Sequence, residues 1–171
     1  MAKLFQEYTI KDVTFKNRIV MAPMCQYSSH NKDGQIEDWH RTNYVTRAVD
    51  KVGLIILEAT AVQPEGRISA QDLCIWRDEY TTGLTEVVNL MKSHGAKTGI
   101  QLAHAGRKAT VDGDIYAPSP LAFNEHYKAP NEMTIDDIKN TVTAFKEAAI
   151  RSKTARFDVI KLHVANGYII N

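Results

Sequence analysis

The chain has 171 residues, of which 44% are hydrophobic and 24% charged, and its formal net charge is +1. This is the composition of a globular protein, with neither a basic excess nor a block of like charges that would indicate nucleic acid or an anionic membrane as a partner. No apolar run approaches the ~18 residues of a membrane helix, no signal peptide is evident, and the two cysteines lack CxxC spacing. We therefore expect a cytoplasmic protein that acts on small molecules and has no metal site.

The predicted elements alternate between strands and helices. Residues 1–17 alternate weakly and predict a small hairpin that could plug one end of a barrel. Apolar runs and helical periodicity then predict, in chain order, a strand at 18–23, a helix at 38–49, a strand at 52–59, a loop through 63–77, a helix at 82–94, a strand from 99, a long loop at 109–132, a helix capped by Thr134 and Asp137, and a strand at 157–163. Apolar strands that alternate with helices form a parallel sheet with helices outside, so the fold class is α/β.

Polar side chains follow each of the four predicted strands. Carboxyl ends of parallel strands meet on one face of an α/β barrel, where such folds build their sites. Carboxylates are sparse in this set and no HExxH-like spacing occurs, which argues against two-carboxylate glycosidase chemistry and against a metal. Neutral donors with a tyrosine acid suit a site that holds a planar heterocycle and polarises a carbonyl group. The set comprises Cys25, Tyr27, Glu58, Thr60, Gln101, His104, Arg107, Lys108, His163, Asn166 and Tyr168.

Other interpretations of these residues stay open at this point. Cys25 and His163 could form a nucleophile–base pair if the fold brings them together. Equally, Cys25 could be a small buried hydrophobic residue, His163 a hydrogen-bonded structural histidine, and Glu58 the partner of a barrel arginine. Gln101 is harder to explain structurally, because a buried amide without partners costs a few kcal/mol.

Three segments of the chain match signatures of a known family. Residues 19–27 (IVMAPMCQY), 99–108 (GIQLAHAGRK) and 163–168 (HVANGY) resemble, in order and spacing, the N-terminal signatures of the Old Yellow Enzyme family of NADH:flavin oxidoreductases. Cys25 together with Tyr27 resembles its bacterial YqjM-like branch. The resemblance implies an FMN-dependent TIM barrel that passes hydride from NAD(P)H to activated alkenes such as enones, nitro compounds and quinones, which is NADPH dehydrogenase or ene-reductase activity.

The resemblance also implies roles for individual residues at the flavin. Cys25 would tune the redox potential of the flavin, and Gln101 would hydrogen-bond the pyrimidine edge of its ring. The full set of flavin-lining residues implied in this way is Ala22, Pro23, Met24, Cys25, Ala59, Gln101 and Lys108.

Substrate contacts are implied from the first and fourth strands. His163 and Asn166 would hydrogen-bond the carbonyl oxygen of the substrate, with Tyr27 assisting there, which makes the β-carbon electrophilic toward hydride. Tyr168 would donate a proton to the α-carbon. The implied catalytic set is Tyr168, His163, Asn166 and Cys25.

Three positions depart from the family pattern. Asn166 stands where the YqjM-like branch usually has histidine, although His/Asn pairs occur elsewhere in the family. Arg156 replaces a glycine at a helix-to-strand junction, where a positive φ would cost arginine about 1 kcal/mol. Lys161 replaces an acidic residue, and the sequence offers no interpretation of this change.

Length is the largest departure, because a complete barrel needs about 250 residues. We expect residues 1–171 to form the N-terminal part of a single FMN-binding domain, namely the N-terminal half of a TIM (β/α)8 barrel. Such a half leaves its first and fourth strands as open edges. By itself it would hold FMN weakly or not at all, and the resemblance implies a homo-oligomer. The alternatives are a non-catalytic remnant, or a half-barrel that self-associates or pairs with a separate C-terminal half.

Overall fold

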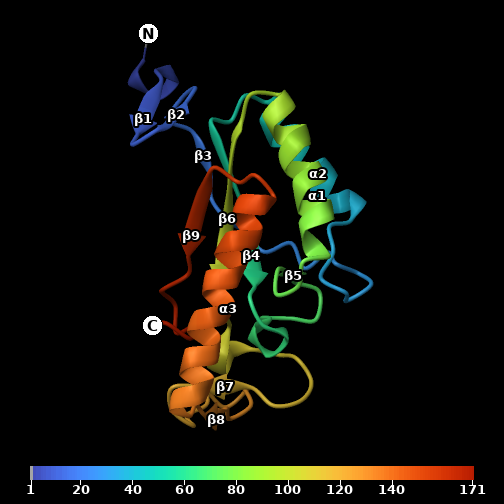
Figure 1. The fold of residues 1–171 in the computed structure, drawn as a ribbon, viewed down its shortest axis with the longest axis vertical. Coiled ribbons are helices and arrows are strands. Elements are labelled where there is room, and N and C mark those ends of the chain that lie inside the picture. The colour runs from blue at the N-terminus through green and yellow to red at the C-terminus, as the bar shows by residue number, and fades with distance from the viewer. Residues whose placement is uncertain (1) are drawn as a thin grey trace.

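A parallel sheet forms the centre of the molecule. The structure is a computed structural model and describes residues 2–171. The sheet order is β3 (Val20–Met21), β4 (Leu54–Ala61), β6 (Lys97–Ala103) and β9 (Val159–Leu162), and the short β5 (Leu73–Cys74) pairs with the end of β4. All these pairings are parallel, and the strands run along the length of the molecule (Figure 1). The α/β prediction is confirmed.

Three helices supply the core against one face of this sheet. They are α1 (Asp38–Val49), α2 (Tyr80–Ser93) and α3 (Ile135–Thr154). Alternate residues of β4 and β6, among them Leu57 and Ile100, are fully buried in one cluster with apolar side chains of these helices. The predicted cap of α3 is confirmed, because the Thr134 hydroxyl accepts from the Asp137 N–H while the Asp137 carboxylate accepts from the Thr134 N–H.

The opposite face of the sheet is covered at one end by the N-terminal hairpin. Its strands are β1 (Tyr8–Ile10) and β2 (Val13–Phe15), preceded by a 3-10 turn at Lys3–Phe5. Phe15 packs with Leu54 and Ile56 at the amino ends of the strands, so the predicted plug is confirmed for this half of a barrel. The hairpin and the loop strands β7 (Tyr116–Ala117) and β8 (Asn131–Glu132) lie at opposite ends of the molecule (Figure 1).

Several boundaries differ from the sequence prediction. The first and fourth strands are shorter than expected, because each pairs along one side only and its ladder covers two and four residues. The segment 63–77, expected to be loop, contains a 3-10 turn at Pro64–Gly66 and β5. A second 3-10 turn, Gly106–Lys108, follows β6, and the predicted long loop contains the β7–β8 pair. Strands of two residues carry no periodicity that a sequence pattern could reveal.

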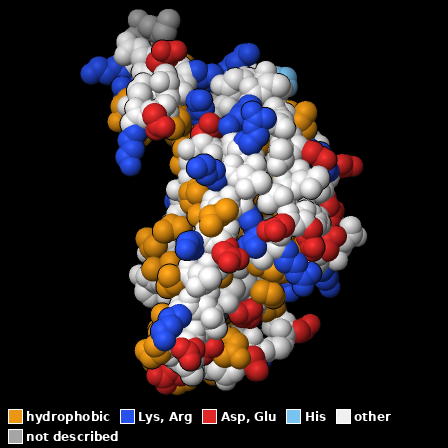
Figure 2. Space-filling model, in the orientation of Figure 1, with side chains coloured by type: hydrophobic (Ala, Val, Ile, Leu, Met, Phe, Trp, Pro, Cys, Tyr) orange, Lys and Arg blue, Asp and Glu red, His pale blue; other side chains and the backbone are white. Residues whose placement is uncertain are grey.

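The two outer strands of the sheet are exposed, as predicted for a half-barrel. Val20 on β3 and both Ile160 and Leu162 on β9 are exposed apolar residues at these edges. Hydrophobic side chains gather on the molecular surface beside β9 and α3 (Figure 2). Among residues 2–171, no helix combines the length and apolarity that crossing a membrane requires.

Candidate functional site

A row of side chains crosses the uncovered face of the sheet. Ala59, Gln101 and Lys161 are register partners on β4, β6 and β9, so their side chains point to the same face. That face is opposite the helices, because the intervening residues Ile100 and Leu102 belong to the helix-side core. The Lys161 Nζ donates to Gln101 Oε1 across 2.5 Å. This contact gives Lys161 a hydrogen-bond partner in the row, whereas the sequence offered no interpretation of this residue.

A β-bulge beside this row places Glu58 under the loop that follows β3. The ladder between β4 and β6 shifts register between Leu57 and Ala59, and Glu58 is the extra residue. Its carboxylate is buried, accepts the Tyr44 hydroxyl at 2.6 Å and accepts the Gln26 N–H at 3.0 Å. Burial raises the pKa of Glu58, and these two hydrogen bonds oppose the rise. Among residues 2–171 no arginine pairs with Glu58, and a phenol and a backbone amide are its hydrogen-bond partners.

Through Gln26, this network fixes the segment that carries Cys25 and Tyr27. Tyr27 adopts φ +50°, and its phenol and the Cys25 thiol are hydrogen-bonded neighbours. The thiol also contacts the backbone of Ala59, so the segment lies over the row. Burial, reinforced by the charges of Asp72 and Glu58, raises the pKa of Cys25. A thiol held protonated in this way is a poor nucleophile, which argues against the nucleophile–base pair.

His163 and Tyr168 form the second half of the site, directly after β9. Their rings meet edge to face with centroids 4.5 Å apart, and the His163 N–H continues the ladder by donating to the Leu102 carbonyl. His163 Nδ1 is buried and has no hydrogen-bond partner among residues 2–171. Burial, followed by the charges of Lys161 and Lys108, lowers the pKa of His163, and burial raises the pKa of Tyr168. At neutral pH the site thus holds a neutral imidazole beside a protonated phenol.

Lys108 and Asn166 meet through the backbone. The Lys108 ammonium donates to the Asn166 carbonyl at 3.2 Å and lies 5.0 Å from the centre of the Tyr168 ring and 4.2 Å from that of Phe123. Asn166 adopts φ +64°, and its exposed side chain makes no hydrogen bond with the described residues. No contact within residues 2–171 therefore joins the Asn166 amide to His163, and their shared role stays a prediction.

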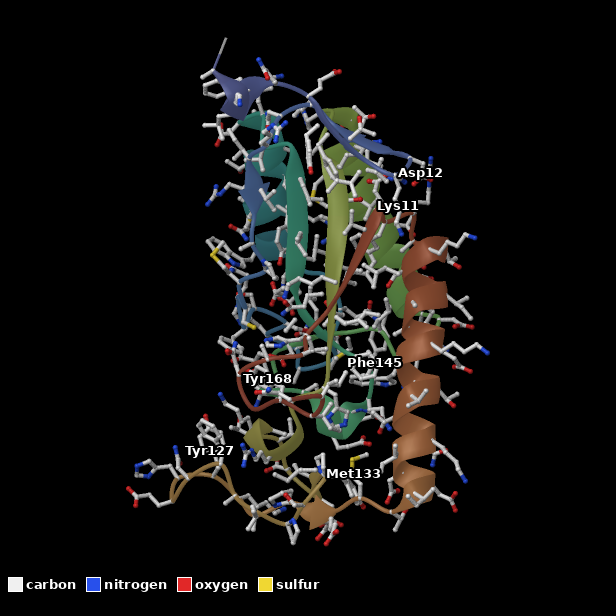
Figure 3. All side chains as sticks on the ribbon, turned by 90° about the vertical axis from the view of Figure 1, so that its left-hand side faces the viewer. Lys11, Asp12, Tyr127, Met133, Phe145 and Tyr168 are labelled. Atoms are coloured by element: carbon white, nitrogen blue, oxygen red, sulfur yellow. The ribbon has the colours of Figure 1, made fainter. Side chains whose placement is uncertain are left out.

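Figure 3 places this site along the molecule. Tyr168 lies toward the β7–β8 end, on the same side as Tyr127, whereas Lys11 and Asp12 of the hairpin lie at the other end. The site is therefore at the carboxyl ends of the strands, where the sequence predicted it. Of the remaining predicted flavin-lining residues, Ala22 is exposed, Pro23 is half-buried and Met24 is 52% exposed, while Ala59 is buried.

Two other candidates from the sequence serve the fold. His104 is buried, and its Nδ1 accepts the Gly106 N–H at 3.1 Å; burial lowers the pKa of His104 to about 4. The Thr60 hydroxyl donates to the Glu58 carbonyl. Within residues 2–171 no cluster of His, Cys, Asp and Glu side chains could hold a metal ion.

Nearly the whole chain is similar to proteins of known family. Residues 3–171 match the NADH:flavin oxidoreductase / NADH oxidase family model. The NADPH dehydrogenase of Bacillus velezensis is 57% identical over 169 residues, which are 99% of this chain and 50% of that protein. The chain spans about half the length of the curated relatives it matches.

Solved structures give the same result for the fold. An Old Yellow Enzyme from Pichia sp. AKU4542 superposes with a TM-score of 0.89 at 26% identity, over 98% of this chain and 47% of that one. Morphinone reductase in complex with tetrahydroNAD superposes with a TM-score of 0.87 at 28% identity, over 99% and 51%. The sheet described above thus corresponds to half of such a protein. The chain belongs to the NADH:flavin oxidoreductase / NADH oxidase family.

Proposed function

We propose that this chain provides the flavin-facing and substrate-facing side chains of an FMN-dependent oxidoreductase that uses NADPH to reduce activated alkenes. One arrangement carries the proposal: the row of Gln101 and Lys161 adjoins the His163–Tyr168 pair at the ends of neighbouring strands. Support also comes from relatives that are named NADPH dehydrogenase and from a structural neighbour in complex with tetrahydroNAD.

The residues of the row fit the ring system of FMN. Gln101 is buried, yet its Nε2 donates to none of the described residues, so it is available to a carbonyl oxygen on the edge of the ring. Ala59 beside it is small enough for a planar group to approach the strand. When bound, FMN supplies the hydride chemistry, which no protein side chain provides.

The chain's own residues would then handle the substrate. A neutral His163 offers an N–H to a carbonyl or nitro oxygen, and its Nδ1 lacks a partner within the described residues. Tyr168, whose pKa is raised, keeps a proton on its Oη for the α-carbon. Cys25 and Tyr27, hydrogen-bonded to each other and held by the Glu58 network, would border the other side of the site. These roles suit enones, nitro compounds and quinones.

Titration of the purified chain with FMN tests the proposal. We expect weak binding, with a dissociation constant of about 0.1–1 mM, because only the contacts of this half are available. Nuclear magnetic resonance shift changes report binding of this strength, and they should centre on Gln101, Lys161 and His163. Gln101→Leu should weaken binding about tenfold, the value of one hydrogen bond, whereas Gln35→Leu should not. An unchanged spectrum at millimolar FMN would overturn the proposal for this chain.

A second candidate, self-association of the half-barrel, is favoured by one observation. Val20 and Leu162 are exposed on the two outer strands, where an apolar edge can pair with another chain. This arrangement would give the expected homo-oligomer, and the two free cysteines suit the reducing cytoplasm. Sedimentation analysis of the purified chain decides it: a monomer at micromolar concentration would remove this candidate.

A further inference from the structure

Lys161 is a cation without an opposing charge in the middle of the candidate site. It stands beside Gln101 in register, on the strand that ends at His163, and its ammonium donates to Gln101 Oε1. Within residues 2–171 it forms no ion pair with a carboxylate, although lysine and arginine side chains form eight ion pairs elsewhere. An exposed lysine with no such partner ordinarily points into water, whereas this one turns toward a buried amide.

The contact decides which end of the Gln101 amide is available. A lysine ammonium has three donors and no acceptor, so it can bind only the carboxamide oxygen. The amide NH2 of Gln101 must then face away from β9. On the side away from this contact the two side chains present donors: the Nε2 hydrogens of Gln101 and the remaining ammonium hydrogens of Lys161. A ligand edge that matches them must carry acceptor atoms and tolerate or require a positive neighbour.

We propose that Lys161 is a positioning residue that fixes Gln101 as a donor to the flavin and, through its charge, favours reduced over oxidised FMN. The inference rests on the proposed function. Hydride transfer from NADPH brings two electrons and one proton to the flavin and leaves NADP⁺, so the ring gains one negative charge unless a second proton follows. A neighbouring ammonium stabilises that charge, more strongly where the partners are shielded from water.

The neighbourhood supports this electrostatic role. His163 also lies in the field of this ammonium, because after burial the charge of Lys161 contributes most to the lowering of the His163 pKa. The positive charge therefore reaches both the flavin-facing and the substrate-facing parts of the site. Lys108, on the loop after β6, adds a second cation near Tyr168, but it bonds a backbone carbonyl and not Gln101. Lys161 is therefore the cation that contacts Gln101 directly.

The test compares the affinities of the chain for oxidised and for reduced FMN. Both constants are measured by resonance shifts, the second under anaerobic conditions with dithionite. Their ratio gives the change in flavin midpoint potential on binding, at about 30 mV per tenfold for two electrons. We expect Lys161→Met to weaken binding of reduced FMN about tenfold more than binding of oxidised FMN. Lys161→Arg keeps the charge and the donors and should retain the wild-type ratio.

Controls separate this effect from loss of charge in general and from misfolding. Lys146→Met removes one exposed lysine of α3 and should leave the ratio unchanged. Lys161→Gln keeps a donor to Gln101 without the charge, so it should retain binding of oxidised FMN and lose the preference for reduced FMN. Thermal unfolding confirms that each variant is folded, and the Gln101 side-chain NH2 resonances should shift in Lys161→Met before any ligand is added.

The results distinguish a failure of this inference from a failure of the proposed function. If wild type binds FMN and Lys161→Met leaves the ratio unchanged, the inference is wrong and the proposed function stands. An equal fall in both affinities is one form of this result, because a purely structural lysine would weaken binding of both redox states equally. If wild type binds neither form, the proposed function fails and this inference fails with it.

Discussion

Strands β4 and β9 belong to the same sheet, but the polar side chains on or next to them have opposite surroundings. Every residue of β4 is buried, and its one carboxylate, Glu58, has all its hydrogen bonds within the protein. Strand β9 is paired along one side only, and most of it is exposed. It carries Lys161, whose ammonium has no carboxylate partner among residues 2–171. It leads to His163, whose Nδ1 has no hydrogen-bond partner among the same residues. Polar groups on the central strand thus stabilise the fold, whereas those on the outer strand remain available to a ligand.

Removal of Glu58 should have the largest effect on stability. In Glu58→Ala, the buried Tyr44 hydroxyl and the Gln26 N–H both lose their acceptor, at 1–3 kcal/mol each, so we expect a loss of about 4 kcal/mol. Urea denaturation measures it. Glu58→Gln keeps one acceptor oxygen and should lose less. Equal stability of Glu58→Ala and wild type would show that the central strand does not depend on this network.

Two isoleucines at matching positions allow the same comparison for apolar side chains. Ile100 and Ile160 are register partners on β6 and β9, yet Ile100 is 0% and Ile160 is 40% exposed. Ile100→Ala should lower the free energy of unfolding by about 3 kcal/mol, because it removes buried apolar surface and leaves a cavity. Ile160→Ala should lower it by less than about 1 kcal/mol. Urea denaturation of both variants gives the difference. Similar losses would mean that β9 is as well packed as the centre of the sheet.

The sequence predicts the central part of the molecule better than its outer strand. Helix α1 spans the predicted residues 38–49, and α2 ends at Ser93, one residue before its predicted end. Such signals are local, because periodicity and caps depend on residues a few positions apart. The two-residue strand β5 was missed for the same reason: its pairing with β4 depends on residues distant in sequence.

The site shows the same limit. The apolar runs predicted which polar residues would gather at the carboxyl ends of the strands, and Cys25, Tyr27, His163 and Tyr168 do lie together there. The Lys161–Gln101 contact could not be predicted, because it depends on the exact register between β6 and β9. The hydrogen bond between Glu58 and Tyr44 could not be predicted either, because the β-bulge that turns Glu58 toward Tyr44 has no sequence signal.

A substitution in the turn that leads into β9 should raise the stability of the protein, by less than the preceding substitutions lower it. Arg156 adopts φ +70°, in the left-handed region that the sequence prediction assigned to this position. Arg156→Gly should stabilise the protein by about 1 kcal/mol, because glycine has no Cβ to clash there. The control is Arg156→Ala, which removes the guanidinium contact with Asn89 but keeps the Cβ and should bring no gain. Thermal unfolding compares the three proteins.

The pKa of His163 tests whether the charge of Lys161 on β9 acts on the site. The expected change in this pKa is the smallest of the predicted effects. Burial, then Lys161 and Lys108, hold the His163 pKa below its usual value of 6.5, so the imidazole is neutral at pH 7 and takes up a proton only at lower pH. Lys161→Met removes one repelling charge and should raise this pKa, whereas Lys161→Arg should not. The change is modest because the partly exposed ammonium is screened by solvent and salt. Resonance titration of the imidazole from pH 4 to 8 measures it. A pKa that stayed the same in Lys161→Met would mean that solvent screens the ammonium of β9 completely and that its charge does not act on the site.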